Sequence, residues 1–247
     1  MEKSSRTDIP LTTQRAMWER WNREANRRRH LAPSPARQAE AVDQFIRSLS
    51  RTDLAILDVG CGTGWLCERL MRYGDVTGTD IVDSALQQAK LHIPNVRFLC
   101  GDFVHIDFVP SSFDVIVSLE VVAHVADQIT FIDRIVELLK PGGHLLLSTQ
   151  NRPVLERWSE VGPPANGQLR SWLNARELRM LLMPRFDDVH ITSLVPVGDR
   201  GILRLVNSHK LNTLLGYVVP NHVIERAKES VMLGHTLFAT AQKKLNS

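Results

Sequence analysis

Three glycines at alternate positions are the first residues whose spacing suggests chemistry. Gly60, Gly62 and Gly64 follow the apolar residues 54–57 and precede a stretch with helical periodicity, in the segment DVGCGTGW. Glycine at a turn from a strand into a helix lets a ligand approach the main chain, and the helix N-terminus offers unpaired N–H groups. A tight turn without a ligand is the structural alternative, which three alternate glycines after a buried strand make the weaker interpretation.

The same loop helps to distinguish two kinds of nucleoside ligand. The dinucleotide fingerprint GxGxxG needs its third glycine at position 65, where this chain has Trp65. Asp58, just before the loop, would repel a pyrophosphate and suits an amino group better. Both residues favour an adenosyl ligand without phosphates, and a nicotinamide-dependent oxidoreductase remains as the rival interpretation.

Further acidic residues occur where later apolar runs end. Asp80 ends the run 75–80, about 20 residues after the loop, where a carboxylate can accept hydrogen bonds from both ribose hydroxyls. Asp102 can accept from an adenine amino group, and Phe103 can pack on the adenine ring. A helix cap is the structural alternative for Asp80. Taken together, the strand ends predict a nucleoside site.

Two alternating kinds of element are expected to hold these residues in place. Short apolar runs alternate with segments of helical periodicity, which predicts a doubly wound α/β fold. In such a fold the helices cover both faces of the sheet, and ligands bind at the edge where the parallel strands end. We expect strands at residues 54–60, 75–80, 96–102, 113–121, 144–150, 186–197 and 235–244.

Helix boundaries are predicted from local signals. Asp83 or Ser84 can cap a helix over residues 82–92, and Pro141 is expected to stop a helix that starts near Ile129. Other helices are expected over residues 65–73, from about Asn174 onward, and in the arginine-rich first fifty residues, where Pro33 and Pro35 mark a break.

Composition limits the class of protein. The 247 residues include 30 Lys and Arg against 27 Asp and Glu, and the net charge of +3 is small for a dedicated nucleic-acid binder. Three cysteines without a CxxC pair disfavour a disulfide scaffold or zinc ribbon and fit a reducing compartment. The N-terminus lacks the apolar core of a signal peptide, and the apolar runs are too short to span a bilayer. These features predict a soluble, cytoplasmic protein.

Five segments resemble the class I S-adenosylmethionine-dependent methyltransferases in order and spacing. They are LDVGCGTG, the strand-end Asp80, GDF, FDVIVSLEVVAHV and LLKPGGHLLLST, which cover roughly residues 50–150. LEVVAHV and STQNR resemble the branch of quinone-biosynthesis O-methyltransferases and their small-molecule relatives. The resemblance implies a Rossmann-like sheet of seven strands whose last strand is antiparallel. It also implies S-adenosyl-L-methionine as cofactor and S-adenosyl-L-homocysteine as product.

The resemblance also assigns parts of the cofactor to particular segments. The glycine loop wraps the methionine part, the strand-end acids hold the ribose and the adenine, and the end of the fourth strand lies near the sulfonium. Arg37 corresponds to an arginine that touches the methionine carboxylate in the quinone branch, at a spacing that differs by a few residues. The expected cofactor-binding residues are Arg37, Asp58, Gly60, Cys61, Gly62, Gly64, Asp80, Ile81, Asp102, Phe103, Leu119 and Glu120.

His124, just past the fourth strand, is the candidate catalytic base. Methyl transfer from a sulfonium is an in-line displacement, and a weakly acidic acceptor also needs a group that takes its proton. An unperturbed histidine titrates near pH ~6.5 and can do so. A structural histidine that orders the loop and touches the cofactor is the open alternative. The resemblance to the quinone branch includes Glu120 and His124, but this chain has Ala123 where that branch has a second acid. One carboxylate and one imidazole are few ligands for a metal ion, so we predict that no metal is required.

The expected domain plan has two parts. Residues 1–50 form a helical cap over the cofactor and substrate site, and residues 51–247 form the methyltransferase domain. Within that domain the cofactor-binding core covers residues 51–150. The acceptor-side elements cover residues 151–247 and include an insertion at about 198–233.

The predicted function is transfer of a methyl group to a small-molecule acceptor, with oxygen as the expected site. The alternative is a tRNA or protein methyltransferase that uses the basic residues 27–29, although few aromatic residues near them disfavour RNA. A non-catalytic adenosyl-binding or scaffold protein is a third possibility, but no cofactor motif is degraded. Neither the acceptor nor the choice between monomer and homodimer follows from the sequence, because acceptor sites are grafted onto the fold.

Overall fold

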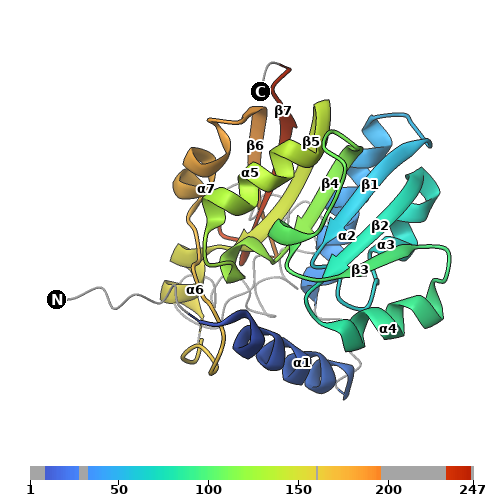
Figure 1. Ribbon diagram of the computed structural model, residues 1–247. Helices are drawn as coiled ribbons and strands as arrows, with labels where there is room; N and C mark the ends of the chain where they lie inside the picture. The colour runs from blue at the N-terminus through green and yellow to red at the C-terminus, as the bar shows by residue number, and fades with distance from the viewer. Residues whose placement is uncertain (1–8, 28–32, 160, 196–231, 246–247) are drawn as a thin grey trace, which may run out of the picture.

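The protein is described by a computed structural model that covers residues 9–27, 33–159, 161–195 and 232–245. Seven strands form one twisted sheet in the order β3-β2-β1-β4-β5-β7-β6, with helices packed along it (Figure 1). The strands are β1 Leu54–Val59, β2 Gly74–Asp80, β3 Arg97–Cys100, β4 Phe113–Leu119, β5 Leu139–Gln150, β6 Phe186–Leu194 and β7 Thr236–Lys243.

Six of the seven strands run in one direction, and the last one in the chain, β7, runs against them. β1 pairs in parallel with β2 and β4, β3 extends one side, and β5 extends the other. β7 is antiparallel to both of its neighbours, β5 and β6. The predicted Rossmann-like sheet with an antiparallel last strand is therefore confirmed. Because the chain crosses from one side of β1 to the other, the ends of β1 and β4 flank the crevice where such sheets bind ligands.

Helices cover both faces of the sheet and complete two hydrophobic clusters. The helices are α1 Leu11–Arg27, α2 Pro33–Ser48, α3 Cys67–Leu70, α4 Asp83–His92, α5 Gln128–Leu138, α6 Arg152–Trp158 and α7 Ala175–Leu182. Successive strand residues point to opposite faces, so Ile56 joins the cluster under α2, α3 and α4, whereas Leu57 joins the cluster under α5 and α7. Burial on both faces explains the almost continuous apolar runs of the central strands.

Some helix ends differ from their predicted positions. Val82 occupies the N-cap position of α4 without a side-chain hydrogen bond, so neither Asp83 nor Ser84 is the cap. Asp83 instead lies in the first turn, where a negative charge interacts favourably with the helix dipole. α5 ends at Leu138, before Pro141, because the chain has already entered β5 at Leu139. The predicted helix over residues 65–73 is divided into the short α3 and a 3₁₀ turn, η1 Met71–Tyr73.

Other ends agree with prediction. Asn174 accepts a hydrogen bond from the Glu177 backbone and Glu177 returns one, which forms a capping box at the start of α7. α2 begins at Pro33, and proline is common at the first position of a helix. The insertion expected at about 198–233 falls almost entirely outside the described residues. Among the helices that the structure describes, none is both long and apolar enough to cross a membrane.

Candidate functional site

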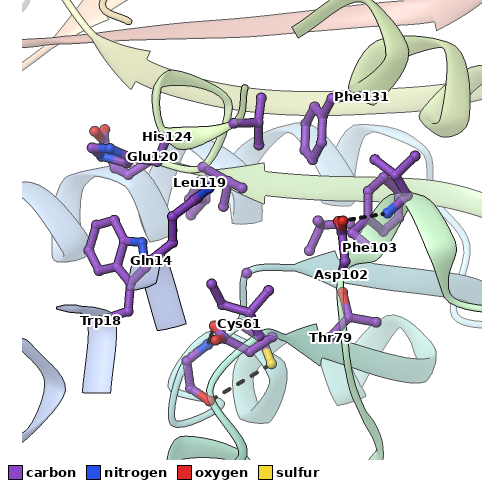
Figure 2. Close-up of a pocket in the computed structure, with 18 of the residues that line it drawn as sticks. Gln14, Trp18, Cys61, Thr79, Asp102, Phe103, Leu119, Glu120, His124 and Phe131 are labelled. Atoms are coloured by element: carbon purple, nitrogen blue, oxygen red, sulfur yellow. Dashed lines mark hydrogen bonds between the residues drawn. The ribbon is translucent and has the colours of Figure 1, made fainter. Parts of the chain in front are cut away.

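A cavity of about 940 Å³ lies at the edge where the parallel strands end. Its walls come from the glycine loop after β1, the ends of β2, β3, β4 and β5, the N-terminal helices, and the segment 168–172. Figure 2 shows its two ends: Asp102 and Phe103 lie at one end, and Trp18 of α1 lies with Glu120 and His124 at the other. This volume suits a small molecule.

The three glycines of the loop have different surroundings, and Gly64, expected to bind the cofactor, packs against Ile93 and does not line the cavity. Gly60 and Gly62 both adopt the left-handed region, with φ of +74° and +55°. A Cβ on Gly60 would lie 2.2 Å from Cγ2 of Val121, so packing excludes any side chain there. A Cβ on Gly62 would have no atom within 4 Å and would enter open space beside the cavity. The main chain at Gly62 is therefore open to a ligand, as the sequence predicts.

Two carboxyl groups lie beside this loop, that of the buried Asp58 and that of the half-buried Asp80. Asp58 is 3% exposed, and its Oδ2 accepts a hydrogen bond from the Cys67 thiol. Burial raises the pKa of Asp58 to about 7, and the nearby charge of Asp80 acts in the same direction. Asp80 accepts hydrogen bonds from the Gly62 and Val82 amides at 2.9 and 2.8 Å, while burial raises its pKa as well. The cavity thus places two acidic groups, whose ionised forms burial disfavours, where the glycine loop is open.

The end of β3 contributes a polar and an aromatic side chain. Asp102 caps the 3₁₀ turn η2 Phe103–His105, and its Oδ2 lies 3.0 Å from Nδ1 of His105. The Phe103 ring packs against Phe131 at 5.2 Å and lines the cavity with Ile81. Asp102, Phe103 and Ile81 thus lie in the wall that the sequence assigned to them, and their contacts with a cofactor stay predictions.

Glu120 follows β4 with a strained backbone. Its φ is +62°, and its Oε1 accepts a hydrogen bond from Nε2 of Gln38 at 3.2 Å. Burial raises the pKa of Glu120 to about 7, although hydrogen bonds from Thr236, Ser148 and Gln38 act to lower this pKa. Leu119 and Glu120 both line the cavity, and their contacts with a cofactor stay predictions.

Arg37 does not line the cavity, which contradicts its expected position. Its Nη1 pairs with Oε2 of Glu40 at 2.9 Å, whereas the neighbouring Gln38 is 3% exposed and lines the cavity. Successive side chains on a helix point about 100° apart, because one turn takes 3.6 residues. Since Gln38 faces inward, Arg37 is turned away. Gln38 thus reaches the site from α2, as does Pro35.

His124 ends a third 3₁₀ turn, η3 Val122–His124, and its ring is held in one tautomer. Its Nδ1 lies 2.7 Å from the carbonyl oxygen of Leu169, which can only accept, so Nδ1 carries the hydrogen. Burial lowers the pKa of His124. The hydrogen bond to Leu169 acts to raise this pKa, and the charge of Arg170 acts to lower it. Nε2 therefore presents a lone pair, 3.4 Å from the Gln150 amide nitrogen. This is the protonation state that a general base needs.

The walls around His124 come from segments far apart in the sequence. The Trp18 ring lies edge-on to the imidazole at 4.8 Å, and Trp21, also on α1, is 56% exposed at the cavity. Gln168, Arg170 and Trp172 line the same region. None of these five was predicted as a site residue. The alternation of side chains in QLRSW is the signal that could have indicated the last three, since alternate residues of an extended segment face one way.

A metal site finds no support in the geometry. Within the described ranges, no group of three or more His, Cys, Asp or Glu side chains is placed to hold a metal ion. That no metal is required nevertheless stays a prediction.

Comparison with known proteins shows similarity to methyltransferases. Residues 57–147 match a family model described as a methyltransferase domain. Over these residues the chain is thus similar to methyltransferase domains. The chain is 42% identical over 116 residues to a ubiquinone biosynthesis O-methyltransferase of Nitrobacter winogradskyi. The aligned residues make up 44% of this chain and 44% of that protein. The chain thus spans less than half the length of the curated relatives that it matches.

Solved structures resemble the chain at lower identity. An S-adenosylmethionine-dependent methyltransferase from Mesorhizobium loti is 17% identical with a TM-score of 0.56, over 81% of this chain and 96% of that one. Phosphoethanolamine N-methyltransferase 2 of Haemonchus contortus, solved with S-adenosyl-L-methionine, is 18% identical with a TM-score of 0.55, over 78% and 49%. At this identity the similarity establishes the fold alone.

Proposed function

We propose that this protein transfers a methyl group from S-adenosylmethionine to a small-molecule acceptor, at oxygen. One observation carries the proposal: the same cavity joins the carboxyl groups of Asp58 and Asp80, beside an open glycine loop, to a neutral histidine. The first end suits a cationic adenosyl ligand. The second suits an acceptor that must lose a proton.

The residues at the first end fit the cofactor by charge and by shape. S-adenosylmethionine carries an ammonium and a sulfonium, and a positive ligand would favour the ionised forms of Asp58 and Asp80 that burial now disfavours. A pyrophosphate would add negative charge at the same place. The open space beside Gly62 leaves room for the methionine part against the main chain. The shape and the charge both favour the adenosyl ligand over a dinucleotide.

The chemistry requires the chain to align an acceptor and remove one proton. When bound, the cofactor supplies a methyl group on sulfur, and transfer breaks the sulfur–carbon bond, whose electron pair stays on sulfur. His124 accepts the acceptor's proton at Nε2, where the acceptor takes the place of the Gln150 amide, while the Leu169 carbonyl holds the proton at Nδ1 and orients the ring. Trp18 packs beside the imidazole and excludes water from it. Alignment of this kind can lower the barrier by about 7–11 kcal/mol.

The N-terminal helices support a small acceptor over a macromolecule. α1 and α2 both line the cavity, which agrees with residues 1–50 acting as a cap over residues 51–247. A tRNA or protein acceptor was the alternative, based on the basic residues 27–29. Arg28 and Arg29 lie outside the described residues, so that alternative gains no support from the structure.

The test is a calorimetric titration of the purified protein with S-adenosylhomocysteine, repeated with NADH. We expect micromolar binding of the first and no binding of the second. An acceptor screen would follow, in which release of S-adenosylhomocysteine reports transfer to hydroxyl compounds. Absence of S-adenosylhomocysteine binding at millimolar concentration would overturn the proposal, and binding of NADH would indicate an oxidoreductase instead.

A further inference from the structure

The Cys67 thiol contacts the carboxyl group of Asp58 from the core of the protein. Its Sγ donates a hydrogen bond to Oδ2 of Asp58 at 3.2 Å. Of these two residues, Asp58 lines the cavity and Cys67 does not, and the Cys67 side chain is fully buried in the hydrophobic cluster under α2, α3 and α4. The carboxyl group thus has the thiol on its buried side and the cavity on its open side.

The segment that carries this thiol is fastened to its neighbours. The amides of Gly60 and Cys61 donate to the Thr79 carbonyl on β2 at 2.7 and 2.9 Å. In α3, Nη2 of Arg69 donates to Oδ2 of Asp43 on α2 at 2.6 Å. These bonds hold the turn between β1 and α3, so the thiol and the carboxyl group, nine residues apart, meet in a defined geometry.

The thiol keeps its hydrogen and can act as a donor. The hydrogen bond with Cys61, burial and the charge of Asp58 all raise the pKa of Cys67, so the thiolate does not form. Among the described residues, no second hydrogen bond to the Asp58 carboxyl group is present. Because a thiol is a weak donor, the carboxylate retains most of its capacity to bind a cation.

The ionisable groups around Asp58 act in opposite directions. Burial raises the pKa of Asp58 most, and the hydrogen bond from Cys67 acts to lower it. The charge of Asp80, at the end of the neighbouring β2, acts to raise it. Glu120 and His124 line the same cavity from the end of β4 and from η3. The thiol therefore favours the ionised carboxyl group before a cation binds, whereas burial and Asp80 oppose it.

We propose that Cys67 is a positioning residue for cofactor binding: its thiol orients the Asp58 carboxyl group so that the second oxygen, Oδ1, meets the ammonium of the methionine part. The inference rests on the proposed function, which places S-adenosylmethionine beside the glycine loop. An ammonium forms charge-assisted hydrogen bonds with a carboxylate, and these are stronger than the bond from a thiol. Cys67 itself touches no ligand and acts through Asp58.

The competing explanation is that Cys67 only fills space in the core, as other residues of its cluster do. The two explanations differ for a ligand that lacks the ammonium. S-adenosylhomocysteine has this group. Its deamino analogue, in which hydrogen replaces the amino group, keeps the adenosyl part and the carboxylate. A packing defect would weaken the binding of both ligands, whereas an effect through Asp58 would weaken only the first.

The first experiment titrates both ligands by calorimetry. At about pH 8 the unaltered protein should bind S-adenosylhomocysteine at least about tenfold more tightly than the analogue. At about pH 6, Cys67→Ala should weaken S-adenosylhomocysteine binding about fivefold, because one hydrogen bond is lost, and should leave the analogue within about twofold. Unchanged binding of the analogue also shows that the variant is folded. Cys67→Ser keeps a donor and should retain most of the affinity for S-adenosylhomocysteine.

The second experiment repeats the titrations of Cys67→Ala at about pH 8. At about pH 6 the Asp58 carboxyl group is largely protonated and must ionise before it binds an ammonium, a step that the thiol assists. At about pH 8 most of the carboxyl groups are already ionised. The loss of affinity in Cys67→Ala should therefore be smaller at the higher pH, whereas a packing defect would cost the same at both.

The control is Cys100→Ala. Cys100 is an exposed free cysteine at the end of β3 and does not line the cavity, so this variant should bind both ligands as the unaltered protein does. Unchanged affinity in Cys67→Ala would overturn the inference, as would equal losses for the two ligands, a loss independent of pH, or an equal loss in Cys67→Ser.

The two proposals fail differently. If the unaltered protein does not bind S-adenosylhomocysteine, the proposed function fails. If it binds S-adenosylhomocysteine and the deamino analogue equally well, the ammonium does not meet Asp58, and only this inference is lost.

Discussion

The two ends of the cavity are built from different kinds of sequence. The cofactor end uses the loop after β1 and the residues that end β2 and β3, which are consecutive elements of one motif series. The acceptor end combines α1, η3, the end of β5 and the segment 168–172. The first is organised by neighbouring parallel strands. The second exists only when distant parts of the chain pack together.

The two ends also differ in electrostatics. At the cofactor end, burial raises the pKa of Asp58 to about 7, which fits a site completed by a cation. At the acceptor end, burial lowers the pKa of His124. One end is thus prepared to bind positive charge, and the other to accept a proton. Substitutions should therefore separate affinity for the cofactor from the rate of transfer.

The largest effect is expected at the acceptor end. His124→Gln should lower the rate of methyl transfer by about 10²- to 10⁴-fold, because a glutamine cannot take the acceptor's proton. The affinity for S-adenosylhomocysteine should change little. Release of S-adenosylhomocysteine measures the rate, and calorimetry measures the affinity. His92→Gln, at an exposed position that ends α4, is the control. A variant with an unchanged rate but weaker binding would reassign His124 to the cofactor end.

A smaller effect, on affinity, is expected from Asp80. Asp80→Ala removes a carboxylate that anchors the Gly62 amide and is expected to hold the ribose. Loss of two charge-assisted hydrogen bonds should weaken S-adenosylhomocysteine binding by about 100-fold. Calorimetry measures the change, with Asp75→Ala, an exposed acid on the same strand, as the control. Similar affinities for the two variants would show that the ribose binds elsewhere.

Alanine at two glycines should separate packing from binding. Gly60→Ala should lower the free energy of unfolding by about 2 kcal/mol, since its Cβ would collide with Val121. Gly62→Ala meets no atom, so its cost is about 1 kcal/mol of left-handed strain, while S-adenosylhomocysteine affinity should fall about tenfold. Denaturant unfolding and calorimetry report the two quantities. Full affinity in Gly62→Ala would mean that the ligand does not approach this loop.

The smallest effect concerns pH. Asp58 has a folded pKa of about 7, above its unfolded value, so it is largely protonated below that pH. S-adenosylmethionine should bind the ionised form, so affinity should decrease from about pH 8 to about pH 6, by at most about tenfold. Calorimetric titrations across this range measure it. Asp58→Asn should bind more weakly and with less dependence on pH, and an unaltered pH dependence would assign it to another group such as Glu120.

The ligand-free protein should show the opposite trend. A raised folded pKa stabilises the folded state below the unfolded pKa, and this contribution is lost as the pH rises through the folded value. Asp58 and Glu120 should therefore make unfolding easier as the pH rises from about 4 to about 7. Denaturant unfolding with and without the cofactor would compare the two trends directly.

Much of the fold could be predicted because its signals are local. Each expected strand is present, and the capping box at Asn174 begins a helix near its expected position. Errors arose where neighbouring elements decide an end. Pro141 was expected to stop α5, but β5 pairs with β4 from Leu139 onward, so the helix ends earlier. Arg37 matched a motif position, yet the rotation of α2 brings Gln38 to the cavity instead.

At the cofactor end the sequence alone determined which residue types follow each strand: alternate glycines after the first, then acids at the ends of the next two. Parallel strands bring such residues to one edge whatever the rest of the chain does. Tertiary structure alone decided the acceptor end. His124 owes its tautomer to Leu169 and its low pKa to burial and to Arg170, which lie some 45 residues away. Contacts of that kind depend on packing between segments, and no spacing along the chain encodes them.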